Sequence, residues 1–245
     1  MTTRVALVTG STQGIGAAIA RRLSADGFAV ALHSRSSVEA GERMAAGLPG
    51  ASYTRADLSN EAETRGLVAA VLKKHGRLDV LVNNAGEVAR FAHGDLKTAT
   101  PQVWRRMMDV NVVAPWLLIA EAEEALRAAS TPQQPACVVN IGTHAAVRPK
   151  GSSIPYAAAK AALHHMSKLL ALTLGPSIRV NVVAPGLVDT AMSTGWDAAY
   201  ELWNTKSPMR RPARPADIAD MVAALIANPY VTGEVVIVDG GLNLT

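Results

Sequence analysis

Tyr156 and Lys160 have the residue types and the spacing of an acid–base pair. They lie four positions apart in a segment with a helical pattern, so both side chains fall on the same helix face. A phenol normally has a pKa near ~10, and a neighbouring ammonium group stabilises the phenolate and lowers that pKa. We therefore expect Tyr156 to act as a general acid towards a carbonyl oxygen, or as a general base towards an alcohol.

A glycine-rich segment near the N-terminus could bind phosphate groups. Residues 9–16 read TGSTQGIG, after a short apolar run and before a helical pattern. The glycines permit a tight turn, and the N-terminus of the following helix offers free N–H groups to a pyrophosphate. The spacing is G-x-x-x-G-x-G, and such a turn alone could be an ordinary loop. Its place between a strand and a helix favours a dinucleotide site.

Composition and charge narrow the class of protein. The chain has 245 residues, of which 49% are hydrophobic and 18% are charged, and this balance excludes a disordered protein. No stretch approaches the ~18 uninterrupted apolar residues of a membrane-spanning helix, and the N-terminus lacks a signal-peptide pattern. Cys137 is the only cysteine, so no disulfide can form within the chain. The net charge of +4 comes without a basic run and favours anionic ligands. We expect a cytoplasmic protein with no membrane or nucleic-acid partner.

Short apolar runs alternate with longer helical patterns along the chain. The expected strands are Val5–Val8, Ala29–His33, Val80–Val82, Cys137–Ile141, Val180–Val183 and Val235–Val238. The expected helices are Ile15–Ala25, Ser37–Ala46, Asn60–His75, Pro101–Ala129, Pro155–Leu174 and Pro215–Ile226. This alternation predicts an α/β fold with a single Rossmann-type, doubly wound parallel sheet, helices on both faces, and one domain over residues 1–245. The irregular stretch 190–215, with a short helix at Trp196–Thr205, predicts a substrate lid at about residues 187–214.

Further motifs follow in an order that resembles the short-chain dehydrogenase/reductase family over essentially the whole chain. The glycine pattern TGxxxGIG is that family's own, and Tyr156 and Lys160 match its YxxxK motif. The other matching segments are Asp57-Leu58, Asn83-Asn84-Ala85-Gly86, Asn111, Pro185-Gly186 with Thr190, and Val238-Asp239-Gly240-Gly241. Each match could be accidental alone, whereas their joint order and spacing are specific.

The resemblance implies a cofactor site and a catalytic group. The expected cofactor-binding residues are Gly10, Thr12, Gln13, Gly14, Ile15, Gly16, Ser34, Arg35, Asp57, Leu58, Asn84, Ala85, Gly86, Tyr156, Lys160, Pro185, Gly186, Val188 and Thr190. The expected catalytic residues are Asn111, Thr143, Tyr156 and Lys160. The family carries a serine 13 residues before the tyrosine, and here that position is Thr143, which keeps the hydroxyl group and adds a methyl group. Asn111 could support a water chain to Lys160, or make only local hydrogen bonds within its helix.

The end of the second expected strand bears on the cofactor. Family members that prefer NAD hold the ribose hydroxyls there with an acidic residue, whereas this chain has Ser34 followed by Arg35. A guanidinium group can bind a 2′-phosphate through two hydrogen bonds, and a carboxylate would repel it. We therefore predict that NADP(H) is preferred, and leave NAD(H) open. Arg35 could also be a solvated loop residue, and Gln13 stands where many NADP-binding relatives carry a basic residue.

Several other side chains have two interpretations each. His144 could line the substrate pocket or lie in a simple loop. Trp196, Tyr200 and Trp203 have helical spacing within the predicted lid, and could cover an apolar substrate or pack the lid against the core. Cys137 is expected to be a buried, inert thiol rather than a nucleophile.

The resemblance is strongest to the branch that holds the 3-oxoacyl-acyl-carrier-protein reductases. It implies NADP(H)-dependent reduction of a ketone or 3-oxoacyl-type carbonyl to a secondary alcohol, or the reverse. Residues 132–135 and 172–176 lack the basic residues that dock the acidic carrier in that branch, so the small-molecule carbonyl or alcohol substrate stays unassigned. The alternatives are a non-turnover dinucleotide-binding sensor and a dehydrogenase for an unrelated small alcohol. The family also implies a homotetramer or homodimer that pairs the Pro101–Ala129 and Pro155–Leu174 helices.

Overall fold

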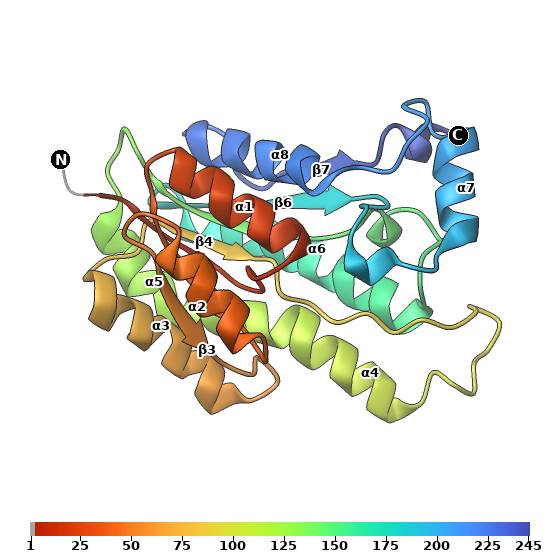
Figure 1. The fold of residues 1–245 in the computed structure, drawn as a ribbon, viewed down its shortest axis with the longest axis horizontal. Helices are drawn as coiled ribbons and strands as arrows, with labels where there is room; N and C mark the ends of the chain where they lie inside the picture. The colour runs from red at the N-terminus through yellow and green to blue at the C-terminus, as the bar shows by residue number, and fades with distance from the viewer. Residues whose placement is uncertain (1–2) are drawn as a thin grey trace.

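A parallel sheet forms the centre of the protein (Figure 1). The structure is a computed structural model that describes residues 3–245, and within this range seven parallel strands pair in the order β3-β2-β1-β4-β5-β6-β7. The strands are β1 Val5–Val8, β2 Ala29–Ser34, β3 Ser52–Arg55, β4 Val80–Asn83, β5 Ala136–Ile141, β6 Ile178–Pro185 and β7 Val235–Val238. The order of the strands reverses between β1 and β4, and such a switch point opens a crevice at the carboxyl ends of the strands.

Helices cover both faces of the sheet. They are α1 Gly14–Ala25, α2 Val38–Ala46, α3 Glu61–His75, α4 Pro101–Met108, α5 Ala114–Ala129, α6 Ile154–Leu174, α7 Asp197–Lys206 and α8 Pro215–Ala227. Apolar side chains of α3, α5 and α6 pack on one face, and those of α1 and α8 pack on the other. Figure 1 shows α1 and α8 on the opposite side of the sheet from α3 and α5. The predicted doubly wound α/β fold is therefore confirmed.

The central strands are apolar on both faces because both faces are covered. In β1, Val5 and Leu7 belong to one core cluster, and Ala6 and Val8 belong to the other. Successive side chains of a strand point to opposite faces, so a strand between two helix layers needs an uninterrupted apolar run. This explains why the sequence predicts the central strands from such runs.

Within residues 3–245, no helix combines the length and the apolar character needed to cross a membrane.

The structure differs from the predicted elements in two places. Strand β3 has no counterpart among the predicted strands, because it lies at the edge of the sheet and its four residues, SYTR, are only partly buried or exposed. The expected helix Pro101–Ala129 is divided into α4 and α5 by a π-helical turn at Asp109–Val113. The side chain of Asn111 donates a hydrogen bond to the carbonyl oxygen of Met107 at 3.0 Å. A side chain that binds a helix carbonyl in this way competes with the regular backbone ladder.

Candidate active site

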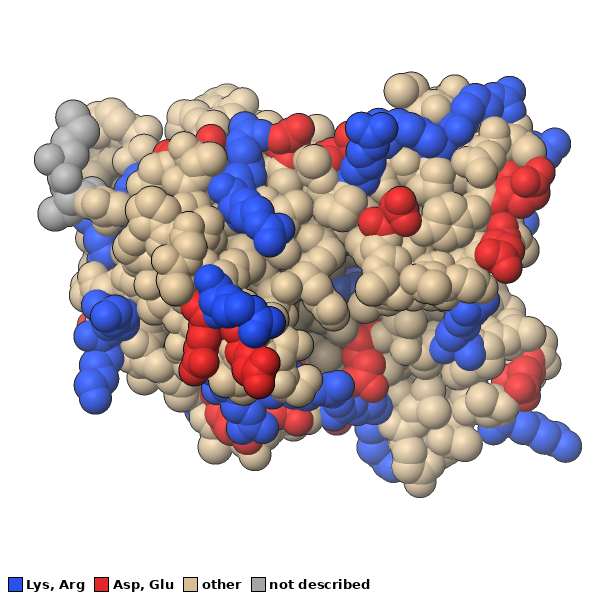
Figure 2. All heavy atoms as spheres, in the orientation of Figure 1, with Lys and Arg blue, Asp and Glu red and all other residues tan. Residues whose placement is uncertain are grey.

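A single cleft collects all the candidate residues. It lies at the carboxyl ends of the strands and has a volume of about 1050 Å³, which is at the upper end of the usual range for ligand pockets. Every expected cofactor-binding residue and every expected catalytic residue lies on its wall. Figure 2 shows acidic and basic side chains interspersed over one face of the molecule rather than separated by sign. Because all the expected site residues line this cleft, it is the place where we expect the predicted chemistry.

The glycine turn forms one end of the cleft. Gly10 has a φ of +62° and donates its N–H to Nδ1 of the buried His33 at 3.1 Å. A Cβ atom at Gly16 would lie 2.2 Å from the carbonyl oxygen of Gly10, so only glycine lets α1 start this close to the turn. Gln13 precedes the helix without capping it, so the first N–H groups of α1 are free for an anion. The turn thus fits a pyrophosphate.

The segment after β4 is fastened to this turn. The side-chain amide of Asn84 donates to the carbonyl oxygens of Thr9 and Gly10 at 2.8 and 3.0 Å. The backbone N–H groups of Asn84 and Ala85 both donate to Oγ1 of Thr9 at 3.0 Å. Asn84 therefore holds the neighbouring loops of β1 and β4 in register and shapes the floor of the cleft.

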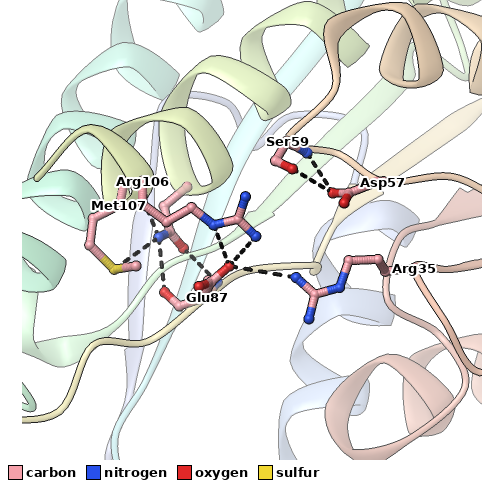
Figure 3. Close-up of polar contacts among 7 residues, drawn as sticks. Arg35, Asp57, Ser59, Glu87, Arg106 and Met107 are labelled. Carbon is pink, nitrogen blue, oxygen red and sulfur yellow. Dashed lines mark hydrogen bonds and ion pairs between the residues drawn. The ribbon is translucent and has the colours of Figure 1, made fainter. Parts of the chain in front are cut away.

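The residues at the end of β2 face the same cleft. Ser34 shares a hydrogen bond with the hydroxyl group of Tyr53 at 2.8 Å, and its side chain accepts the N–H of Ser37. The side chain of Arg35 is 58% exposed, so it can reach a ligand. Hydrogen bonds from Ser59 to the carboxylate of Asp57 lower the pKa of this carboxyl group, and Figure 3 shows the Asp57–Ser59 pair. The sequence did not single out Tyr53 or Ser59.

Tyr156 and Lys160 lie in the first turns of α6. Ser153 caps this helix by accepting the N–H of Tyr156 at 3.4 Å, and Pro155 occupies the first turn, where its fixed φ is compatible with a helix. The ammonium group of Lys160 is buried and donates to the carbonyl oxygen of Ile141, at the end of β5, at 2.8 Å. The start of α6 is therefore tied to the β5 end, where Thr143 follows.

Burial dominates the protonation of the Tyr156–Lys160 pair. Burial raises the pKa of Tyr156 to about 12, and a hydrogen bond with Thr143 only partly opposes this. Loss of water around Lys160 lowers its pKa to about 8. The expected lowering of the Tyr156 pKa by Lys160 is therefore wrong for this structure. The reason is that desolvation outweighs other influences on the phenol, and the ammonium group is engaged with the Ile141 carbonyl oxygen.

Thr143 is held through its backbone and its side chain. Its N–H donates to Nε2 of His164 at 3.4 Å, and its Oγ1 accepts the N–H of Ala145 at 3.3 Å. His164 is 6% exposed, and burial together with Lys160 and Lys168 lowers the pKa of His164 to about 4. The imidazole is therefore neutral at pH 7 and can accept this hydrogen bond.

The contact between Thr143 and His164 depends on Gly142. A Cβ atom at Gly142 would lie only 2.1 Å from Nε2 of His164. The sequence did not point to this role of His164, because one turn of helix places it near Lys160 without indicating what its ring faces. The glycine directly before Thr143 is the only signal in the sequence that could have suggested the close approach.

Asn111 lies in the π-helical turn, near the loop after β4 and Lys160. Its side-chain amide donates to the carbonyl oxygen of Glu87 at 2.9 Å, and its Oδ1 accepts the N–H of Glu87 at 3.3 Å. A Cβ atom at Gly86 would lie 2.9 Å from Oδ1 of Asn111 and 3.4 Å from Nζ of Lys160. Asn111 therefore makes contacts beyond its own helix and lies close to Lys160, as a group that supports a water chain would need to.

Part of the cleft is lined by aromatic side chains. His144 is buried, lines the cleft, and meets the ring of Trp203 edge-on, with 5.2 Å between the ring centroids. Trp196 also lines the cleft, whereas Tyr200 points its hydroxyl group at Asp189. Trp196 and Trp203 thus line the cleft, whereas Tyr200 makes its hydrogen bond within its own segment.

Comparisons with other proteins agree with this geometry. A family model described as "Enoyl-(Acyl carrier protein) reductase" matches residues 10–243. The chain is 45% identical over 243 residues to "Granaticin polyketide synthase putative ketoacyl reductase 2" of Streptomyces violaceoruber, covering 98% of this chain and 96% of that protein.

Solved structures share the fold over the whole chain. A "putative short-chain dehydrogenase/reductase" from Burkholderia xenovorans matches with a TM-score of 0.92 and 32% identity, covering 100% of both chains. The RhlG/NADP active-site complex of Pseudomonas aeruginosa matches with a TM-score of 0.90 and 34% identity, covering 99% of this chain and 97% of that chain. The sheet and its cleft define a Rossmann-type oxidoreductase. The chain belongs to the short-chain dehydrogenase/reductase family.

Proposed function

We propose that this protein is an NADP(H)-dependent oxidoreductase that reduces a ketone or 3-oxoacyl-type carbonyl to a secondary alcohol, or catalyses the reverse reaction. One observation carries the proposal: the Tyr156 hydroxyl group, hydrogen-bonded to Thr143, lies in the same cleft as the glycine turn. A proton donor and a dinucleotide-type phosphate site thus face one space. The ketoacyl reductase name of the Streptomyces violaceoruber relative supports the same class of substrate.

The chain's residues would hold the cofactor along the cleft. The glycine turn from Gly10 to Gly16 and the free N–H groups of α1 would bind the pyrophosphate. The adenosine part would meet Ser34, Arg35, Asp57, Leu58, Asn84, Ala85 and Gly86, and the nicotinamide part would meet Pro185, Gly186, Val188, Thr190 and Lys160. When bound, a nicotinamide cofactor supplies or accepts a hydride at the substrate carbon.

Tyr156 would transfer the proton of the reaction. With the pKa of Tyr156 raised to about 12 and that of Lys160 lowered only to about 8, both groups are mostly protonated at pH 7. This is the state that donates a proton to a carbonyl oxygen, with the hydroxyl group of Thr143 as a second hydrogen-bond donor to that oxygen. In the oxidation direction, the same phenol would have to lose its proton first, which its raised pKa opposes.

Arg35 supports the choice of NADP(H). It follows β2, where an acidic residue would repel a 2′-phosphate, and its guanidinium group is largely exposed to the cleft. The RhlG/NADP complex of the solved relative agrees with this assignment. We expect Arg35→Asp to reverse the preference, as measured by the dissociation constants of NADPH and NADH. An unchanged preference for NADPH would refute the assignment.

The reaction is tested by a panel of carbonyl compounds. Oxidation of NADPH is followed with simple ketones, diketones and β-ketoacyl thioesters, and Tyr156→Phe serves as the variant without the phenol. We expect turnover with at least one compound class and its loss in Tyr156→Phe. Tight NADPH binding without turnover of any compound would favour a dinucleotide-binding sensor instead. The same panel tests the proposed lid, since removal of the Trp196 ring should change KM for apolar ketones more than for small ones.

A further inference from the structure

Glu87 places a carboxylate between two guanidinium groups in the cleft (Figure 3). Its Oε2 accepts hydrogen bonds from Nε of Arg106 at 2.8 Å and lies 2.6 Å from Nη2 of the same residue. The same oxygen lies 3.8 Å from Nη1 of Arg35. One carboxylate oxygen is thus shared by two cations that come from different elements.

The three residues bridge two walls of the cleft. Arg35 follows β2, Glu87 lies in the loop after β4, and Arg106 belongs to α4. The backbone of Glu87 is fixed by Asn111, which accepts its N–H and donates to its carbonyl oxygen. The backbone that carries the carboxylate is therefore held at a defined place, whereas the side chain of Arg35 is 58% exposed.

The local charges balance without any ligand. Arg35 and Arg106 carry two positive charges, and both interact with the carboxylate of Asp57 as well as with Glu87. Two carboxylates therefore face two guanidinium groups around the position after β2. A phosphate that arrived at Arg35 would add about two negative charges to a set that is already neutral.

We propose that Glu87 is a cofactor-specificity residue that works against the 2′-phosphate. Its carboxylate occupies Arg35 when no phosphate is present, and it repels a phosphate that takes its place. A ribose with a free 2′-hydroxyl group has no charge to repel and can donate a hydrogen bond to a carboxylate. This inference rests on the proposed function, because it presumes that a nicotinamide dinucleotide occupies the cleft with its adenosine end at Arg35.

In this proposal, two groups of residues in the cleft have opposite effects on the choice of cofactor. Ser34 and Arg35 replace the acidic residue that would favour NAD(H), and Glu87 restores a carboxylate from the other side of the cleft. The resulting preference for NADP(H) is smaller than Arg35 alone would give. Because the side chains of Glu87 and Arg35 are both partly exposed, water and salt screen their interaction and its effect is moderate.

The test is Glu87→Gln, which keeps the shape of the side chain and removes its charge. Dissociation constants for NADPH and NADH are measured by equilibrium titration of cofactor fluorescence, which needs no turnover. We expect the dissociation constant of NADPH to fall and that of NADH to rise, so that their ratio shifts by about tenfold towards NADPH. A purely structural role of Glu87 would change both constants in the same direction and leave the ratio constant.

Two further variants complete the experiment. Glu121→Gln removes a carboxylate that pairs with Arg65 on the surface, outside the cleft lining, and we expect it to leave the ratio unchanged. In an Arg35→Gln background, Glu87→Gln should improve NADPH binding much less, because the cation for which carboxylate and phosphate compete is absent.

The outcomes separate this inference from the proposed function. If Arg35→Gln weakens NADPH binding while Glu87→Gln leaves the ratio unchanged, the inference about Glu87 is wrong and the NADP(H) assignment stands. If the parent protein binds neither cofactor, the proposed function fails and the inference fails with it. A shift of the ratio towards NADPH in Glu87→Gln, absent in Glu121→Gln, supports the proposal.

Discussion

At the scale of single residues, the hydroxyl group of Thr143 is the part of the proposed mechanism that differs most from the family pattern. Its Oγ1 accepts the N–H of Ala145, and its side chain also forms a hydrogen bond with the phenol of Tyr156. Thr143→Val keeps the shape and removes the hydroxyl group. We expect turnover to fall by about 100-fold, the typical effect of losing one donor to the reacting oxygen, with little change in NADPH affinity.

Two comparisons keep this prediction specific. Thr143→Ser should retain most of the turnover, because it restores the hydroxyl group. Thr173→Val removes a hydroxyl group that binds the carbonyl oxygen of Leu169 on the exposed side of α6, and it should leave turnover unchanged. Steady-state rates with the best carbonyl compound decide the question, and a fully active Thr143→Val protein would remove Thr143 from the mechanism.

The lowered pKa of the buried His164 should make the stability of the folded protein depend on pH. The pKa of its imidazole is about 4 in the folded protein, against an ordinary value of 6.5. Between these two pH values the unfolded chain binds more protons, so the free energy of unfolding should fall as the pH drops from 6.5 to 4, by up to about 3 kcal/mol. This contribution is fully present above pH 6.5.

Denaturant unfolding at pH 7 and at pH 4.5 measures this effect. His164→Gln should lose less stability on acidification than the parent, because glutamine does not titrate. His165→Gln is the matched control, since His165 is the exposed neighbour on the same helix, and it should behave like the parent. Equal losses in the parent and in His164→Gln would show that other groups cause the acid sensitivity.

Some roles of single residues could be predicted from the sequence and others could not. The types and the spacing of Tyr156 and Lys160 placed them on one helix face, and the family resemblance joined them with the glycines in one expected site, which the structure gathers in one cleft. The roles of His164 and Glu87 were not predictable, because each depends on what its side chain faces across the fold. The protonation of Tyr156 was mispredicted for a related reason, since helical spacing does not reveal how much water a side chain loses.

At the scale of elements, the start of α1 depends on a backbone contact that no side chain permits. Gly16→Ala would place a Cβ atom 2.2 Å from the carbonyl oxygen of Gly10. We expect the free energy of unfolding to fall by roughly 1–3 kcal/mol as the helix is displaced from the turn, and NADPH binding to weaken. Chemical denaturation and a cofactor titration measure the two effects.

A glycine elsewhere in the fold provides the control. Gly66 lies in the exposed part of α3, and a Cβ atom there would meet nothing within 4 Å. Gly66→Ala should therefore stabilise the protein by about 0.5–1 kcal/mol through helix propensity without affecting NADPH. If both variants changed stability in the same direction, close approach at Gly16 would not be the cause.

Most elements were predictable because burial imposes a pattern on them. The central strands carry apolar runs, and their predicted ends differ from the structure by at most two residues at either end. Strand β3 was not predicted, because an edge strand is covered less and can be polar. The π-helical turn at Asp109–Val113 was not predicted either, because the contacts of the Asn111 side chain with Met107 and with the Glu87 loop depend on the fold and leave no pattern in the sequence.

At the scale of the whole molecule, several helices expose large apolar side chains. Helix α4 packs against α6, and α4, α5 and α6 expose large apolar side chains. These residues and their exposed fractions are Trp104 37%, Trp116 48%, Ile154 39%, Leu169 54% and Leu172 85%. Exposed apolar side chains of this size are common at protein interfaces. They are compatible with the homotetramer or homodimer that the family resemblance implies, in which the helices of residues 101–129 and 155–174 pair between subunits.

The expected assembly is tested by charge substitution on these helices. Trp116→Asp combined with Leu172→Asp should convert the assembly into a smaller species, because an interface of about 800 Å² per partner cannot bury two unpaired carboxylates. Size-exclusion chromatography with light scattering gives the mass of each species. Leu96→Asp is the control, since Leu96 is 71% exposed outside these helices, and it should leave the mass unchanged. A parent protein that elutes as a monomer would refute the proposed assembly, and an intact assembly of the double variant would place its interface elsewhere.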